Sequence, residues 1–316
     1  MAVLVTGANG FIGSPVCQGL ADRGYGVVAM YHRHRQRLDE TGPRQRLHVE
    51  RGDLLDTGSL RRILAAYRIE AICHLAVEPP PAGVCDEAET RRINTTGTRN
   101  LLICAADAGI ERIVFTSSMS VYDFLNPQYL PVDEEHPLDP KEVYGQEKLA
   151  AERICEGVGE ARLLKIVILR LAGVFGRGKP QGAVYNFTKR AFRGEAIRIA
   201  QNRSVDLLHV DDAATAVATE LDRIDEIIDT PGGTRVYNVG SGGPASLAEI
   251  AQCACAATGR TVDIHVDCSG SSFYMDIQAA KRDLSYRPEP LATGVAAIAA
   301  WIAERGMGIS TSSYLS

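Results

Sequence analysis

A glycine-rich turn directly follows the first apolar run of this sequence. Residues 2–6 predict a short buried strand, and residues 7–13 read Gly-Ala-Asn-Gly-Phe-Ile-Gly before a helical pattern begins. Glycines at this spacing permit a tight turn and a close backbone approach to a phosphate, and the N-terminus of the following helix presents free N–H groups. The spacing is GxxGxxG, unlike the GxGxxG of long-chain dehydrogenases. Its place straight after a strand predicts a dinucleotide-binding turn.

Apolar runs and helical patterns alternate through the first half of the chain. Buried strands are predicted at residues 2–6, 26–30, 47–51, 71–76, 112–117 and 165–171. Helices are predicted between them, at residues 15–23, 58–67, 90–108 and 143–156. This order is typical of right-handed crossovers between parallel strands, with helices on both faces of the sheet. The predicted fold is therefore α/β: a Rossmann-like, doubly wound parallel sheet, which binds ligands at the carboxyl ends of its strands.

The pattern becomes irregular after residue 172, and no Ser/Gly/Pro-rich linker marks a boundary. We expect residues 1–172 to form the dinucleotide-binding domain, with strand-like segments near 205–240 returning to it. Residues 173–306 are expected to form mostly a smaller C-terminal substrate-binding lobe. The polar residues 307–316 predict a poorly ordered tail.

Composition narrows the class of protein. The 316 residues carry a net charge of −5, and 45% are hydrophobic, so neither nucleic acid nor an anionic membrane is expected as a partner. No apolar stretch is long enough to span a bilayer and no signal-peptide pattern is present, so we expect a cytoplasmic protein. The eight cysteines form no CxxC pair and no Cys/His zinc spacing, so neither a disulfide framework nor a metal site is expected.

Tyr144 and Lys148 are four residues apart in a predicted helix and therefore share one of its faces. Tyrosine, with an unperturbed pKa of about 10, is a poor base at neutral pH, but a nearby ammonium stabilises the phenolate. Such a pair suits proton transfer to or from an alcohol while a hydride moves to or from the same carbon. Ser118 follows the predicted strand 112–117, at the edge where this fold binds ligands, and its hydroxyl can hydrogen-bond the reacting oxygen.

With these residues the chain resembles the extended short-chain dehydrogenase/reductase family, which includes nucleotide-sugar epimerases, dehydratases and ketoreductases. The resemblance covers nearly the whole chain. The motifs occur in the family's order: the glycine turn, Gly52-Asp53-Leu54, His74-Leu75-Ala76, residues 94–100, Ser117-Ser118 with Val121-Tyr122, Tyr144 with Lys148, Leu169-Arg170-Leu171 with Val174-Phe175-Gly176, His209-Val210-Asp211-Asp212, residues 237–242, Asp276-Ile277 and residues 284–288.

The resemblance implies roles for particular residues. Ser118 is the catalytic hydroxyl, Tyr144 is the acid/base, and Lys148 tunes Tyr144 and holds the nicotinamide ribose. The implied cofactor-binding residues are Gly7, Asn9, Gly10, Phe11, Ile12, Gly13, Tyr31, His32, Arg33, Arg35, Asp53, Leu54, Leu75, Ala76, Asn94, Tyr144, Lys148, Leu171 and Val174. The implied substrate-binding residues are Ser118, Met119, Ser120, Gly173 and Arg203.

The end of the second strand bears on the choice of cofactor. An acidic residue at this place usually holds the adenosine ribose hydroxyls of NAD. Here Tyr31 takes the place, and a basic run follows at residues 32–37. Cations without a carboxylate suit a 2′-phosphate, with Arg33 and Arg35 as its partners. The sequence therefore predicts NADP, with NAD as the alternative.

Departures from the family pattern bear on the substrate, which we expect to be a small molecule, possibly a nucleotide sugar. Met119 and Ser120 stand where the family's dehydratases carry an Asp-Glu pair and its two-carbon epimerases a cysteine, so both classes are excluded. Gly173 replaces a substrate-binding asparagine, and of the family's diphosphate-binding arginines only Arg203 offers a substitute. The leading hypothesis is an NADP-dependent 4-ketoreductase of a nucleotide-sugar-like substrate. A 4-epimerase and a non-catalytic NADP-binding regulator are the alternatives.

Family members often dimerise through two helices of each subunit. By this resemblance we expect a homodimer, formed through residues 90–108 and 143–156.

Overall fold

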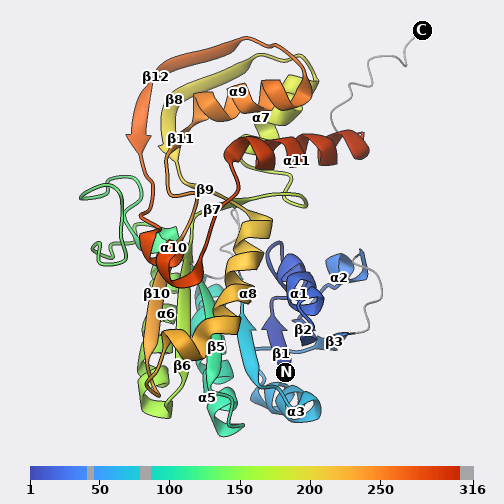
Figure 1. Cartoon of the computed structure of the whole chain (residues 1–316), viewed down its shortest axis with the longest axis vertical. Coiled ribbons are helices and arrows are strands. Elements are labelled where there is room, and N and C mark those ends of the chain that lie inside the picture. Colours follow the sequence, from blue (N-terminus) through green and yellow to red (C-terminus); the bar gives the residue numbers. More distant parts are fainter. Residues whose placement is uncertain (41–45, 79–86, 307–316) are drawn as a thin grey trace.

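Within residues 1–40, 46–78 and 87–306, which the computed structural model describes, seven parallel strands form the central sheet (Figure 1). Their order is β10-β6-β5-β4-β1-β2-β3. The strands are β1 (Ala2–Thr6), β2 (Gly26–Tyr31), β3 (Leu47–Arg51), β4 (Ala71–His74), β5 (Arg112–Ser118), β6 (Lys165–Leu171) and β10 (Thr234–Val239). Because β2 and β4 flank β1 on opposite sides, the chain changes direction across the sheet at β1, which creates the ligand crevice of this fold.

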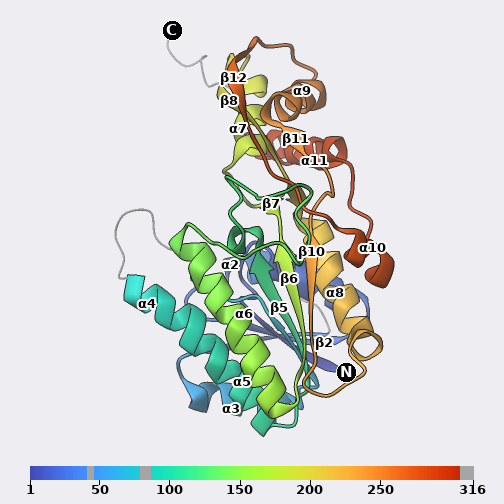
Figure 2. The same cartoon turned by 90° about the vertical axis from the view of Figure 1, so that its left-hand side faces the viewer.

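Helices cover both faces of this sheet (Figures 1 and 2). One face carries α1 (Gly13–Asp22) and α8 (Val210–Ile227), and the other carries α3 (Thr57–Tyr67), α5 (Thr98–Asp107) and α6 (Val143–Arg162). Side chains alternate along the strands: Val3 and Val5 join the core under the first group, and Leu4 joins the core under the second. All three are fully buried. The predicted doubly wound sheet is confirmed.

A smaller lobe lies at one end of the large sheet (Figure 1). It contains β7 (Gly173–Phe175), β8 (Ile197–Val205), β9 (Leu207–His209), β11 (Ala245–Ser246), β12 (Ile264–Ser272), α7 (Ala183–Phe192), α9 (Leu247–Thr258) and α11 (Leu291–Glu304). Tyr185, Ile250 and Trp301, one from each of the three helices, meet in its apolar core. Between these elements the chain returns to the large sheet with α8 and β10, and α10 (Gln278–Leu284) packs beside them. The tail expected at residues 307–316 lies outside the described residues.

The helix predicted at residues 143–156 is longer in the structure and ends at Arg162. Gly157 and Gly159 follow the predicted end of the helix and would be expected to end it, yet both lie inside α6. A Cβ on Gly159 would lie 3.0 Å from Cδ1 of Ile166, so this glycine lets α6 pack closely on β6. The helix ends where Leu163 adopts a left-handed conformation with φ of 59°.

The single helix predicted at residues 90–108 is instead three segments: α4 (Glu87–Arg92), a π-helical turn (Ile93–Gly97) and α5. Asn94 is buried in the π-helical turn, and its amide bonds both the backbone of Glu78 and the carboxylate of Glu147. These bonds join segments far apart in sequence, so the local helical pattern carries no signal for the turn.

Across the described ranges, no helix has both the length and the apolar character required to cross a bilayer.

Candidate active site

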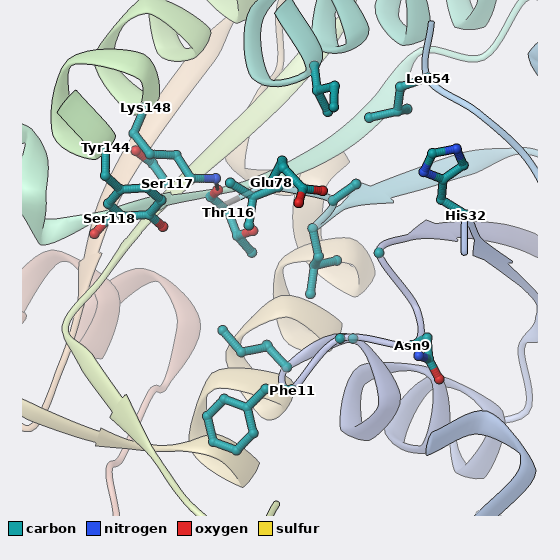
Figure 3. Close-up of a pocket in the computed structure, with 18 of the residues that line it drawn as sticks. Asn9, Phe11, His32, Leu54, Glu78, Thr116, Ser117, Ser118, Tyr144 and Lys148 are labelled. Carbon is teal, nitrogen blue, oxygen red and sulfur yellow. Dashed lines mark hydrogen bonds between the residues drawn. The ribbon is translucent and has the colours of Figure 1, made fainter. Parts of the chain in front are cut away.

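A cavity of about 890 Å³ opens where the strands β1, β2, β4, β5 and β6 end (Figure 3). Ser118, Tyr144 and Lys148 lie together at one end of the view, and His32 and Leu54 lie at the other. The other predicted site residues that line the cavity are Gly7, Asn9, Gly10, Phe11, Ile12, Gly13, Tyr31, Arg33, Asp53, Leu75, Ala76, Met119, Ser120, Leu171, Gly173 and Val174. Folding therefore gathers most of the residues singled out in the sequence around one space.

The glycine turn forms one wall of the cavity with backbone rather than side chains. Gly7 has a φ of +68°, and a Cβ on it would lie 2.7 Å from the backbone nitrogen of Ala76. A Cβ on Gly13 would lie 2.1 Å from the carbonyl oxygen of Gly7. Helix α1 begins at Gly13, which lines the cavity, and no side chain caps it, so the positive end of the helix dipole is open to an anion. This cradle fits the diphosphate of a dinucleotide.

Ser118 ends β5 and lies beside Tyr144, near the N-terminus of α6 (Figure 3). The Ser118 hydroxyl oxygen accepts a 3.1 Å hydrogen bond from the N–H of Ser120. Burial raises the pKa of Tyr144, and a hydrogen bond with the Ser118 side chain offsets part of that rise. The phenol and the hydroxyl can therefore share a proton with a substrate oxygen placed between them.

Lys148 lies one helical turn after Tyr144 and is buried. Its Nζ donates a 2.8 Å hydrogen bond to the carbonyl of Thr116 and lies 4.9 Å from the centre of the Phe115 ring. Burial lowers the pKa of Lys148 to about 8. Although the sequence predicts that Lys148 tunes Tyr144, the contribution that lowers the pKa of Tyr144 in this structure comes from Ser118.

Gly145 allows the contact between the helix and the strand that carry this set. A Cβ on Gly145 would lie 2.0 Å from the carbonyl oxygen of Ser120 and 2.9 Å from Cβ of Pro140. Any larger residue would push the start of α6 away from the end of β5. The glycine therefore fixes how closely Tyr144 approaches Ser118.

A buried ion pair between β6 and α6 contacts β5, the strand that ends at Ser118. Nη2 of Arg170 on β6 lies 2.8 Å from Oε2 of Glu152 on α6, and both side chains are almost fully buried. Glu152 also accepts a hydrogen bond from the hydroxyl of Ser117, the neighbour of Ser118. Arg170 donates a 2.8 Å bond to the hydroxyl of Tyr122, which donates to the Asn238 side chain at 2.9 Å. This network joins β5, β6, α6 and β10.

At the opposite end of the cavity, the basic residues that follow β2 face carboxylates. Nη1 of Arg33 lies 4.0 Å from Oε1 of Glu78, and Nε2 of His32 lies 3.7 Å from Oδ2 of Asp53. These contacts are exposed and individually weak. The carboxylates nevertheless add negative charge beside the cations that the sequence assigns to a 2′-phosphate. The position of Glu78 opposite Arg33 could not be predicted from the local sequence pattern.

Three predicted site residues do not line the cavity. Arg35 is exposed, and its Nε lies 3.3 Å from the carboxylate of Asp39. Asn94 is buried in the π-helical turn and holds neighbouring segments instead. Arg203 lies on β8, beside Gly270 of β12, in the smaller lobe.

Lys179 lines the cavity although the sequence patterns do not single it out. It follows β7 in a loop, and loop residues lack the periodicity that would reveal their position.

The described residues contain no cluster of three or more His, Cys, Asp or Glu side chains able to hold a metal ion.

Comparison with known proteins identifies the family. The model of the NAD dependent epimerase/dehydratase family matches residues 3–240. The chain belongs to this family. The resemblance to extended short-chain dehydrogenases/reductases is thus confirmed, and the protein is an enzyme of that type.

Relatives within the family align over most of their length. Human UDP-glucose 4-epimerase is 30% identical over 300 residues, covering 84% of each chain. UDP-glucuronate 4-epimerase 6 of Arabidopsis thaliana is 30% identical and covers 95% of this chain and 71% of its own.

Solved structures of family members superpose on this fold. The UDP-glucose 4-epimerase of Thermotoga maritima with UDP-glucose has a TM-score of 0.83 at 25% identity, covering 96% of this chain and 99% of its own. The UDP-glucuronic acid 4-epimerase of Bacillus cereus, with UDP-glucuronic acid and NAD, has a TM-score of 0.82 at 26% identity, covering 96% of this chain and 100% of its own.

Proposed function

We propose that this enzyme is a 4-epimerase of a nucleoside diphosphate hexose, working with NAD. The observation that carries the proposal is the alignment with a UDP-glucose 4-epimerase over 84% of both chains. Ser118, Tyr144 and Lys148, which all line one cavity, support it. The NADP-dependent ketoreductase, the leading hypothesis from sequence, finds no specific support among these relatives. Because Ser118, Tyr144 and Lys148 are all present at the cavity, an enzyme is favoured over a non-catalytic regulator.

In the proposed reaction, NAD held in the cavity beside Ser118, Tyr144 and Lys148 would supply the hydride acceptor for C4 of the sugar and, once reduced, the donor that returns the hydride. Tyr144 takes the proton of the 4-hydroxyl as the C4–H bond breaks, and it gives the proton back when the 4-ketone is reduced from its other face. Ser118 hydrogen-bonds the same substrate oxygen. Lys148, which the Thr116 carbonyl holds one helical turn from Tyr144, would bind the nicotinamide ribose of the cofactor. The reaction has no net oxidation, so it needs no external reductant.

Incubation with UDP-glucose, and separately with UDP-glucuronic acid, tests this proposal. We expect one of them to convert into its C4 epimer without added reductant, detected by chromatography or by proton NMR of the anomeric signals. The reaction should approach the same product ratio from either epimer. A 4-ketoreductase would behave differently: it would consume NADPH in equal amount with a 4-keto sugar and leave both 4-hydroxy sugars unchanged.

NAD, rather than the NADP expected from the sequence, is supported by two observations. The structure of the related UDP-glucuronic acid 4-epimerase holds NAD. In this chain Glu78 and Asp53 lie near Arg33 and His32, and Arg35 contacts Asp39 outside the cavity. A 2′-phosphate would meet these carboxylates as well as the cations.

The proposal includes a homodimer formed through α5 and α6, as expected from the sequence. A groove of about 520 Å³ runs along the outer surface of these helices. Its lining residues combine apolar and small side chains with arginines: Arg99, Ile103, Arg153, Ile154, Gly157, Val158, Ala161 and Arg162. A groove between two helices that is lined by apolar and small side chains and bordered by arginines suits the helices of a second copy, packed as a four-helix bundle.

Native mass spectrometry of the purified full chain tests both the dimer and the identity of the cofactor. We expect the mass of a dimer and, after denaturation, release of NAD rather than NADP. Ala161→Glu places a charge in the groove and should yield monomer. Purification of a monomer would contradict the dimer, and NADP in the denatured sample would contradict the choice of cofactor.

A further inference from the structure

The loop between β7 and α7 reaches across to the glycine turn. Nη2 of Arg37 donates a 2.6 Å hydrogen bond to the carbonyl of Gly178, and the backbone N–H of Arg37 donates to Oδ1 of Asn9 at 2.9 Å. Asn9 belongs to the glycine turn, and Gly178 precedes Lys179 in the loop. Three segments far apart in sequence are thus tied together around the N-terminus of α1.

Lys179 extends from this loop into the cavity. Its Nζ donates a 2.9 Å hydrogen bond to the carbonyl of Val174 and lies 5.6 Å from the centre of the Phe11 ring. Phe11 lies in the glycine turn, two residues before α1 begins. The ammonium therefore lies near a side chain of the glycine turn that leads into that helix.

The ammonium of Lys179 has no counter-charge among the described residues. Burial lowers its pKa, and no carboxylate contributes to raise it. An ammonium has three hydrogen-bond donors, and the bond to Val174 uses one of them. A partly buried cation without an anion is costly to keep, unless a ligand supplies the anion. Two other cations of the cavity differ from Lys179 in this respect, because the carboxylate of Glu152 acts on Lys148 and Glu78 faces Arg33.

We propose that Lys179 binds the diphosphate of the dinucleotide cofactor, opposite the N-terminus of α1, an inference that rests on the proposed dinucleotide binding but not on the epimerase reaction. Backbone N–H groups of the glycine turn hold the diphosphate from one side, and Lys179 holds it from the other. Lysine is suited to this as a compact charge on a flexible stem. Because Lys179 comes from the first loop of the smaller lobe, it ties that lobe to the cofactor.

Calorimetric titration of the full chain and of Lys179→Gln tests the inference. The probes are NAD, ADP-ribose, which keeps the diphosphate, and adenosine, which lacks it. Loss of one hydrogen bond to a charged group predicts about 10- to 100-fold weaker binding of NAD and ADP-ribose. Adenosine should bind equally well to both proteins. Lys179→Arg, which keeps the charge, should recover most of the affinity.

Lys189→Gln is the matched control. Lys189 also holds its ammonium near an aromatic ring, 5.7 Å from the centre of Tyr185, but it lies on α7 and does not line the cavity. This variant should bind all three probes like the wild type. Raising the salt concentration should weaken NAD binding by the wild type more than by Lys179→Gln, because the removed contact is ionic.

Other outcomes would overturn the inference. Unchanged NAD affinity in Lys179→Gln would do so, as would an equal loss for adenosine, which would indicate a change of cavity shape. Weaker binding of UDP to the NAD-loaded enzyme, with NAD affinity unchanged, would assign Lys179 to the substrate's diphosphate. A chain that binds NAD through Lys179 but does not epimerise any sugar would contradict only the proposed function.

Discussion

Tyr144→Phe is expected to lower kcat by about 10²–10⁴-fold, the usual contribution of a positioned acid/base. The change removes a single oxygen and leaves the ring beside Ser118, at the start of α6. NAD should therefore bind almost as tightly as before. Steady-state kinetics with the accepted nucleotide sugar, together with calorimetric titration of NAD, measure both effects.

The pH profile gives an independent readout of the same residue. A base acts in its deprotonated form, so the rate of the oxidation step should rise with pH toward the pKa of Tyr144. Burial raises that pKa, which moves the rising limb to higher pH than for a phenol in water. In Tyr144→Phe this limb should be absent from the residual activity.

Tyr129→Phe is a suitable control for the loss of a phenolic hydroxyl. Tyr129 is exposed, and its hydroxyl donates a 2.8 Å hydrogen bond to Asp133 outside the cavity. Its kcat and pH profile should match those of the wild type. Near-normal turnover by Tyr144→Phe would remove Tyr144 from the role of acid/base.

Arg170→Met is expected to reduce the free energy of unfolding by about 3–5 kcal/mol, the range for removing one partner of a buried ion pair. The variant leaves the carboxylate of Glu152 buried without its guanidinium, and the hydroxyl of Tyr122 loses a donor. Urea unfolding at fixed cofactor concentration, followed by fluorescence of Trp301 and by circular dichroism, measures the change.

Two further variants compare the stability contribution of this buried ion pair with that of an exposed ion pair. Replacing both partners, Arg170→Met with Glu152→Leu, should recover much of the loss because no uncompensated charge remains. Arg61→Met removes an exposed contact with Asp107, at 3.4 Å, and should cost less than about 1 kcal/mol. If Arg170→Met cost no more than Arg61→Met, the network would not be a main support of the sheet.

The order of strands and helices could be predicted because it depends on short-range patterns. The strands at Ala2–Thr6, Leu47–Arg51 and Lys165–Leu171 match the prediction at both ends. Helix ends were harder to predict. Gly159 looks like a stop in sequence, but in the structure it is a contact point with Ile166, a residue that follows the helix.

The meeting of Ser118, Tyr144 and Lys148 at one cavity could be predicted because each of them belongs to a regular element. Ser118 ends a strand, and Tyr144 and Lys148 share a helix face, so the topology brings them to one edge of the sheet. The contacts of charged loop residues depend instead on distant partners. Glu78 opposite Arg33 and Lys179 above Phe11 follow only from the folded chain.

The position of β10 has a consequence for how the chain is made. Residues 1–171 contain β1 to β6, and β10, which covers the outer edge of β6, is synthesised only at residues 234–239. Until then the growing chain presents β6 as an open edge, whose residues 166–171 are all buried in the finished protein. An apolar open edge readily pairs with other chains. We therefore expect a nascent chain that is released before residue 239 to be prone to aggregation, even though its glycine turn is complete.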